Sequence, residues 1–150
     1  MLFRSKPCLY FDTAYVGKCY LNEPDSAAVR ELTRSAERIY TSALCIAELA
    51  CALHRKVREG SLAAKDARKL SDFFLEDVSS EIWSLVPVSD ANLRQVDLLI
   101  RQLPKSSPLR AGDAIHIVSA MDAGFAELWT NDRHLLAAAA HFGIKGRSVK

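Results

Sequence analysis

The segment CLYFD, residues 8–12, is an apolar run near the start of the chain that ends abruptly in a carboxylate. Its apolar and aromatic side chains do not alternate with polar ones, which is typical of a strand covered on both faces. We therefore expect a buried strand over residues 7–12 with Asp12 at its carboxyl end. Because burying a lone carboxylate costs several kcal/mol or forces it to take up a proton, Asp12 needs a partner.

Strands and helices alternate along the rest of the chain. Further strands are predicted at residues 39–42, 82–88 and 127–130, with an edge strand at 147–149. Helices are predicted at residues 14–21, 25–35, 43–59, 61–78, 89–100, 110–123 and 132–142. Ser42 is the expected N-cap of the third helix, and Asp25 or Ser26 that of the second. Short strands separated by helices predict a parallel sheet with helices on its faces, in which ligands gather at the carboxyl ends of the strands.

The composition is that of an ordinary globular protein. The 150 residues are expected to form one domain, residues 1–150. Its content of 49% hydrophobic and 25% charged residues is that of a folded protein rather than of a disordered tail. A net charge of +2 permits a nucleic-acid partner without requiring one. The cysteines have no zinc-site spacing and suit a reducing cytosol, with Cys45 and Cys51 expected in the core. No apolar run has the length of a membrane span, so we expect a cytoplasmic protein.

Three further acidic residues occupy positions where a lone charge is unexpected. Glu48 is the only charge between residues 43 and 53, Asp113 opens the apolar helix AIHIV, and Asp132 follows a short apolar strand. Together with Asp12 they form a set that we call the four acids. Because they come from distant parts of one small chain, a shared partner is the simplest explanation, and a divalent cation is the simplest partner.

Each of the four acids also has a structural explanation. Asp12 and Asp132 are good helix N-caps, a role compatible with metal binding because one carboxylate oxygen can accept an amide proton while the other faces a cation. Glu48 would otherwise need a buried ion pair with a distant Arg or Lys, and Asp113 complements the helix dipole. His116, one turn after Asp113, is expected to be a packed, hydrogen-bonded residue rather than a metal ligand.

Taken together, an all-oxygen set of carboxylates suits a hard cation such as Mg²⁺ or Mn²⁺, whereas zinc prefers His or Cys. Such an ion lowers the pKa of bound water and stabilises charge on phosphoryl oxygens. Hydrolysis of a phosphodiester is therefore the expected reaction class.

Four segments that carry these acids resemble, in order, the motifs of the PIN-domain nucleases, and most closely the VapC-type toxins of bacterial toxin–antitoxin modules. The first motif is similar to YFDTA at residues 10–14 with LNEP at 21–24, and the second to TSAL at 41–44 with AEL at 47–49. The third is similar to LRAGDAIH at 109–116, and the fourth to WTNDRHLL at 129–136. The chain departs from the pattern at Ala14, where relatives often carry Ser.

The resemblance implies a three-layer α/β/α sandwich with a mostly parallel sheet and an Mg²⁺- or Mn²⁺-dependent endoribonuclease activity. Asp12, Glu48, Asp113 and Asp132 would be its catalytic and metal-binding residues, with Thr130 as a weaker polar partner. It also implies an RNA substrate, a cognate antitoxin and a homodimer. The basic residues that flank the motifs, and are equally explained as solvated charges, are Arg110, Arg133, Lys18 and Arg55.

Three alternatives remain open at this point. A PIN-fold nuclease that processes RNA outside a toxin–antitoxin module would use the same residues. A non-catalytic PIN-like binding module would retain the acids without using them. A phosphotransfer domain is disfavoured, because a phosphatase of that kind needs a second acid two residues after Asp12, where Ala14 stands.

Overall fold

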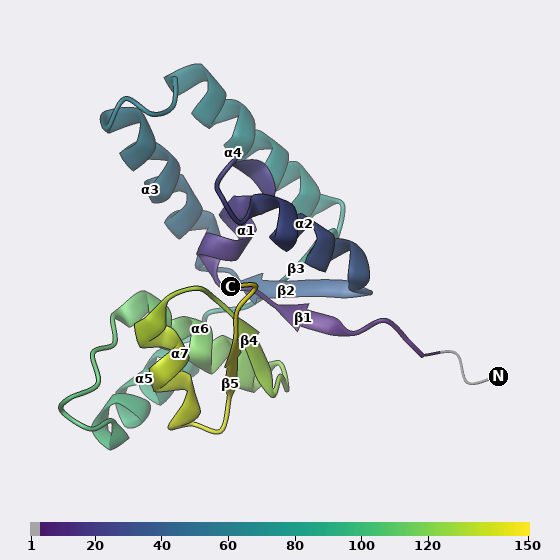
Figure 1. Cartoon of the computed structure of the whole chain (residues 1–150). Helices are drawn as coiled ribbons and strands as arrows, with labels where there is room; N and C mark the ends of the chain where they lie inside the picture. The colour runs from purple at the N-terminus through teal and green to yellow at the C-terminus, as the bar shows by residue number, and fades with distance from the viewer. Residues whose placement is uncertain (1–3) are drawn as a thin grey trace.

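The computed structural model describes residues 4–150 and contains helices and strands in alternation (Figure 1). Residues 1–3 of the expected domain lie outside the described part. The strands are β1 (Cys8–Tyr10), β2 (Arg38–Ser42), β3 (Trp83–Val86), β4 (Glu127–Trp129) and β5 (Lys145–Arg147). The helices are α1 (Thr13–Tyr20), α2 (Ser26–Ser35), α3 (Cys45–Arg58), α4 (Ala64–Ser79), α5 (Asp90–Gln102), α6 (Ala111–Asp122) and α7 (Arg133–Ala140).

The strands run parallel, as the alternation of strands and helices predicts. One sheet has the order β1-β2-β3, and β4 pairs with β5 in a second. A parallel bridge between Phe11 and Trp129 joins the two, and the amide of Asp12 donates to the Trp129 carbonyl oxygen at 3.2 Å. Because β2 lies on one side of β1 and β4 on the other, the chain changes direction at the carboxyl end of β1. Such a switch point is where parallel sheets bind ligands.

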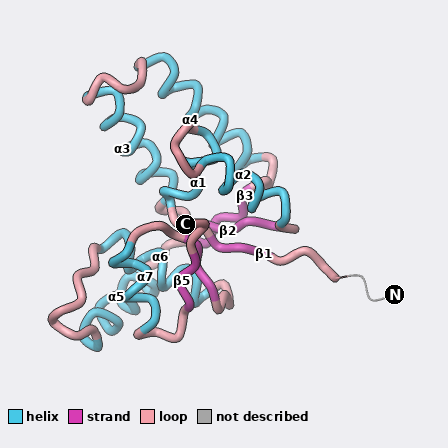
Figure 2. Tube along the Cα trace, in the orientation of Figure 1, coloured by secondary structure: helices cyan, strands magenta, loops and turns pink. Residues whose placement is uncertain are grey.

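Helices cover the strands on both faces, and the tube in Figure 2 shows the magenta strands between two groups of cyan helices. Helices α1 to α4 lie on one side and α5 to α7 on the other. Strand β1 and the residue that follows it contribute to the hydrophobic clusters on both faces. Leu9 and Phe11 pack in the cluster that contains Val16 and Phe74, whereas Tyr10 packs in the opposite cluster. The expected α/β/α arrangement is therefore confirmed, and the apolar character of residues 9–11 follows from burial on both faces, whereas Cys8 is exposed.

The beginnings of three elements differ from the sequence expectation. Ser42 does not cap α3, because its hydroxyl accepts the amide of Leu44 within a turn and the helix begins at Cys45. Helix α4 begins at Ala64 rather than residue 61, since a loop follows Gly60, whose φ of 76° ends the preceding turn. Strand β5 pairs over Lys145–Arg147, two residues earlier than expected.

Two expectations from composition can be compared with the structure. Cys45 is buried as expected, but Cys51 is exposed, because α3 presents its other faces to α1 and α4. Ile46 is also 42% exposed, so the apolar start of α3 is not buried all round. Among the helices of residues 4–150, none has the length and apolar character to cross a bilayer.

Candidate active site

The four acids lie in one pocket of about 510 Å³, formed by α1, α3, α6 and the start of α7. Each comes from a different element: Asp12 follows β1, Glu48 belongs to α3, Asp113 to α6, and Asp132 precedes α7. Arg55, Lys56 and Arg110 line the same pocket. The fold thus brings together carboxylates that are separated by up to 120 residues of sequence.

Asp12 is held rigidly at the carboxyl end of β1. Its side chain is buried, one oxygen (Oδ1) accepts the amide of Tyr15 at 2.9 Å, and the other (Oδ2) accepts the Thr130 hydroxyl at 2.5 Å. Burial raises the pKa of this carboxyl above its usual value, although the hydrogen bond from Thr130 offsets part of the effect. Asp12 is therefore both the N-cap of α1 and a member of the pocket, so the two roles coexist.

Among residues 4–150, Glu48 has no ion pair with an Arg or Lys, which was its alternative explanation. Its Oε1 atom accepts the Thr13 hydroxyl at 2.7 Å and lies 2.8 Å from Nε2 of His116. Nδ1 of His116 lies 2.9 Å from the Tyr10 hydroxyl. One neutral tautomer satisfies both contacts, with Nε2–H donating to Glu48 and Nδ1 accepting from Tyr10.

These contacts favour the charged form of Glu48. Burial by itself would raise the pKa of Glu48, but the hydrogen bonds from His116 and Thr13 lower it overall. His116 is only 1% exposed and sits between Tyr10 and Glu48, which makes it the packed, hydrogen-bonded residue that the sequence suggested. The Glu48 carboxylate is thus fixed at Oε1, while Oε2 faces α6.

The backbone of α6 approaches Glu48 at Gly112. A Cβ atom added to Gly112 would lie 2.6 Å from Oε2 of Glu48, well inside ordinary contact. A larger residue at position 112 would require the Glu48 carboxylate to shift, and the next residue along the helix is Asp113. The close approach therefore brings the acids of α3 and α6 next to each other.

Asp113 and Asp132 complete the acidic lining. Burial raises the pKa of Asp113, and the neighbouring charge of Asp132 raises it further. Oδ1 of Asp132 accepts the amides of His134 and Leu135, so Asp132 caps α7 and Asn131 does not. Burial and the nearby Asp132 carboxylate therefore both disfavour the charged form of Asp113.

Thr130 lies where a hydroxyl near the site was expected. Besides donating to Asp12, its oxygen accepts the amide of Asp132 at 3.0 Å. Thr13 and Tyr10 are polar partners that the sequence reasoning missed. Thr13 directly follows Asp12 at the first position of α1, which is the signal that could have identified it.

The basic residues divide into two groups. Arg110 and Arg55 line the pocket, and so does Lys56, which the sequence reasoning did not include. Lys18 instead pairs with Glu23 at 2.8 Å and is largely buried. Arg133 is exposed at the start of α7 and, in residues 4–150, is not part of the pocket lining.

The donor chemistry of the pocket fits a hard divalent cation held largely through water. Within residues 4–150, no three His, Cys, Asp or Glu side chains are already arranged to ligate an ion directly. Mg²⁺ keeps several of its waters and uses one or two carboxylates, so a lining of carboxylates around a pocket of this size suits it. Burial raises the pKa of both Asp12 and Asp113, and a bound cation would favour their charged forms.

Comparison with known proteins gives a family match. The profile of the family described as PIN domain matches residues 9–141. Among curated proteins, none matches this chain at a significant level of sequence similarity.

Several solved structures share this fold. One is VapBC2 from Rickettsia felis, bound to a DNA fragment from its promoter. Its chain has a TM-score of 0.66 and 15% sequence identity with this one, and the similarity covers 94% of this chain and 98% of that chain. VapC20 from Mycobacterium tuberculosis, a Sarcin-Ricin loop cleaving toxin, has a TM-score of 0.69 and 16% sequence identity, and the similarity covers 87% of this chain and 94% of that chain. FitAcB from Neisseria gonorrhoeae has a TM-score of 0.61 and 18% sequence identity, and the similarity covers 92% of this chain and 95% of that chain. At these identities the similarity establishes the fold.

Proposed function

Because the chain belongs to the PIN domain family, we propose that it is a metal-dependent endoribonuclease and the toxin of a type II toxin–antitoxin module. The observation that carries the proposal is the pocket in which Asp12, Glu48, Asp113 and Asp132 meet at the carboxyl ends of β1 and β4. Four carboxylates gathered in one pocket that cations also line support a site for a divalent cation.

Mg²⁺ or Mn²⁺ bound by the four acids would lower the pKa of a water molecule and neutralise charge on the phosphoryl oxygens of RNA. The protein's own contribution is to fix the acids before substrate arrives. Thr130 and the Tyr15 amide fix Asp12, while Thr13 and His116 fix Glu48. Such preorganisation avoids reorganisation of the site during the reaction.

The cations on the pocket wall are suited to hold RNA against the negative field of the acids. Arg55 and Arg110 are exposed side chains that line the pocket from α3 and from the residue preceding α6. Phosphate contacts of this kind position a nucleic acid without reading its sequence. We propose that these two arginines contact the RNA backbone on either side of the scissile bond.

The partners follow from the same family comparison. Structures similar to this chain include VapBC2 with promoter DNA and FitAcB, which supports a cognate antitoxin for this chain. We also propose that the protein works in the cytoplasm, where RNA is available, and forms a homodimer. A small gene beside this one whose product relieves growth inhibition would separate a toxin from an RNA-processing PIN nuclease.

Cleavage of total RNA tests the enzymatic proposal. The purified protein should cleave RNA with Mg²⁺ or Mn²⁺, and a chelator should abolish the cleavage. Asp113→Asn should lower the rate by at least about a hundredfold, because loss of groups that only support a metal ligand already costs ten- to hundredfold. Asp97→Asn is a matched control, since Asp97 is an exposed helical residue of α5 that pairs with Arg101. Cleavage that survives both the chelator and Asp113→Asn would overturn the proposal.

A further inference from the structure

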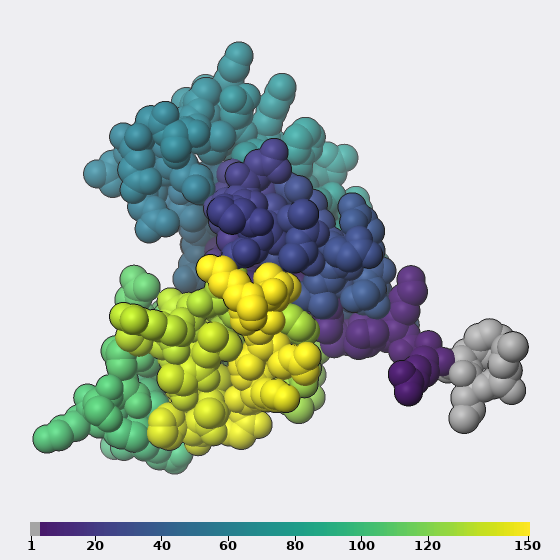
Figure 3. Space-filling view, viewed as in Figure 1, coloured from purple at the N-terminus to yellow at the C-terminus, as the bar shows by residue number. Residues whose placement is uncertain are grey.

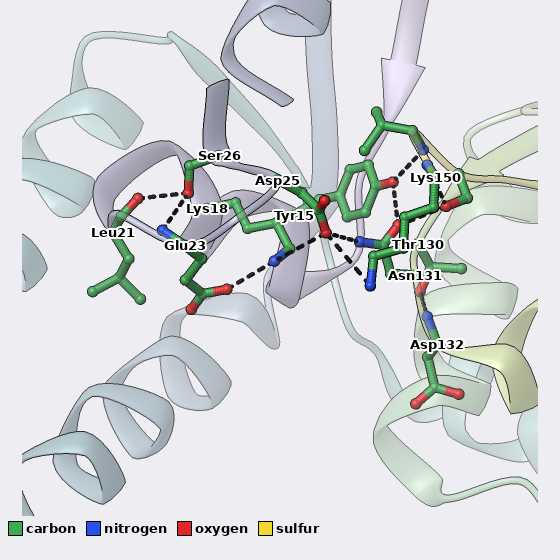
Figure 4. Close-up of polar contacts among 12 residues, drawn as sticks. Tyr15, Lys18, Leu21, Glu23, Asp25, Ser26, Thr130, Asn131, Asp132 and Lys150 are labelled. Carbon is green, nitrogen blue, oxygen red and sulfur yellow. Dashed lines mark hydrogen bonds and ion pairs between the residues drawn. The ribbon is translucent and has the colours of Figure 1, made fainter. Parts of the chain in front are cut away.

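The last residues described, 148–150, pack against the loop that carries two of the site residues. Figure 3 shows the yellow C-terminal residues in contact with the dark blue surface of the N-terminal third of the chain. Figure 4 shows Lys150 close to Asn131 and Asp25, with the ring of Tyr15 beside them. The loop in question, residues 130–132, joins β4 to α7 and contains Thr130 and Asp132.

Asn131 is the centre of this contact. Its Oδ1 atom accepts the hydroxyl of Tyr15 at 2.7 Å and that of Ser148 at 2.7 Å, and its Nδ2 atom donates to Asp25 at 3.0 Å. The amide of Asn131 thus uses both of its ends within the protein. A side chain that only solubilised a loop would have no reason to make three such bonds.

Tyr15 connects the loop to the acid at the end of β1. Its ring is fully buried against Phe11 and Trp129, and its hydroxyl accepts the amide of Val149 at 2.9 Å while donating to Asn131. Its own backbone amide donates to Oδ1 of Asp12. One residue of α1 therefore holds an acid with its backbone and the opposite loop with its side chain.

Asp25 ties the arrangement to the start of α2. Besides accepting from Asn131, its carboxylate lies 3.9 Å from Nζ of Lys18 and 3.6 Å from Nζ of Lys150. Its side chain does not cap α2, so it is free for these contacts. We name Tyr15, Asp25, Asn131 and Ser148 the clasp.

We propose that Tyr15 and Asn131 are positioning residues, which act through the clasp to hold Thr130 and Asp132 in register with Asp12. The reason is their place in the chain: Asn131 stands between Thr130, which donates to Asp12, and Asp132, which lines the pocket. Releasing Asn131 loosens both neighbours at once. The catalytic consequence rests on the proposed nuclease function, but the order of the loop can be measured without it.

The substitution Tyr15→Phe keeps the ring and removes the hydroxyl that holds Asn131 and Val149. The matched control is Tyr20→Phe on the same helix, because the Tyr20 hydroxyl likewise makes two bonds, to Asp77 and to the indole of Trp83, away from the pocket. Hydrogen exchange of the amides of residues 130–132 should become about tenfold faster in Tyr15→Phe, the change expected for the loss of one or two hydrogen bonds, and should stay unchanged in Tyr20→Phe.

RNA cleavage adds a second readout. For Tyr15→Phe we expect kcat to fall about five- to tenfold with KM for RNA unchanged, because the arginines that would bind RNA lie outside the clasp. If the wild-type protein does not cleave RNA, the proposed function fails, and the exchange measurement still decides whether the clasp holds the loop.

A reciprocal exchange provides a further test. In Asn131→Asp the new carboxylate faces that of Asp25, so exchange in residues 130–132 should accelerate. Adding Asp25→Asn restores a donor opposite an acceptor and should return the exchange rate towards that of the wild type. The proposal is overturned if Tyr15→Phe and Tyr20→Phe change the exchange of residues 130–132 equally, or if the double variant exchanges as fast as Asn131→Asp alone.

Discussion

Gly112→Ala should damage the site more than the fold. An added Cβ would lie 2.6 Å from Oε2 of Glu48, whereas ordinary contact begins at 3.4 Å, so the carboxylate must retreat by about 0.8 Å. Oε1 of the same group lies 2.8 Å from Nε2 of His116. A retreat of that size lengthens this contact by up to about 0.8 Å, which weakens or breaks the hydrogen bond.

The magnitude follows from two opposing terms. Losing a hydrogen bond to a charged group costs about 1.5–3 kcal/mol, while replacing a helical glycine by alanine gains up to about 1 kcal/mol. The net destabilisation of about 1 kcal/mol lowers Tm by about 2–4 °C in a chain of this size. Cleavage of RNA should fall about ten- to hundredfold, as is usual when the support of a metal ligand is lost.

Gly17→Ala is the control for the helix term. Its added Cβ would meet a methyl group of Leu49 at 3.5 Å, an ordinary contact, so this variant should be up to about 1 kcal/mol more stable. Thermal unfolding of both variants, with RNA cleavage measured in parallel, separates the two terms. The reasoning is refuted if Gly112→Ala gains as much stability as Gly17→Ala and cleaves RNA at the wild-type rate.

Three further predictions concern two of the acids and Thr130, the hydroxyl donor to a third. Asp113→Asn should raise the Tm of the metal-free protein while abolishing cleavage, because it removes the two causes of the raised Asp113 pKa, the burial of a charged carboxylate and its repulsion with Asp132. A group whose folded pKa is raised stabilises the fold only at low pH, so this gain should be largest near neutral pH and vanish below about pH 4, as urea unfolding would show. The pKa of Glu48 is lowered in the folded state, so its carboxylate stabilises the fold near neutral pH and not at low pH. Glu48→Gln should therefore destabilise the protein most near neutral pH. Thr130→Val should cost about 1–3 kcal/mol of unfolding free energy, because the buried Asp12 loses a donor; an unchanged unfolding free energy would contradict the assigned bond.

The strands could be predicted from local pattern, and the meeting of the four acids from local pattern together with the motif resemblance. The unbroken apolar run at residues 8–11 predicts burial on both faces, and residues 9–11 indeed lie in the two hydrophobic cores, whereas Cys8 is exposed. Asp12 and Asp132 follow strand ends, and parallel strands bring such ends to one edge. The motif resemblance placed Glu48 and Asp113 beside them.

The partners of these acids could not be predicted, because they depend on which side chains meet across the fold. Glu48 is held by Thr13 and His116, which are 35 and 68 residues away in sequence. Lys18 was a candidate for RNA, yet Glu23 pairs with it. The exposure of Cys51 was missed for a related reason, since an apolar helix can leave a small residue outside when its larger side chains fill the core.

Helix capping by the acids affects the choice of inactivating substitution. Asp12 and Asp132 accept amide protons at the first turns of α1 and α7, and asparagine caps a helix about as well as aspartate does. Alanine would remove the cap together with the charge and so mix misfolding with loss of chemistry. If the chain is the proposed toxin, an inactive variant for trapping RNA or for capturing an antitoxin should therefore carry Asn at these positions.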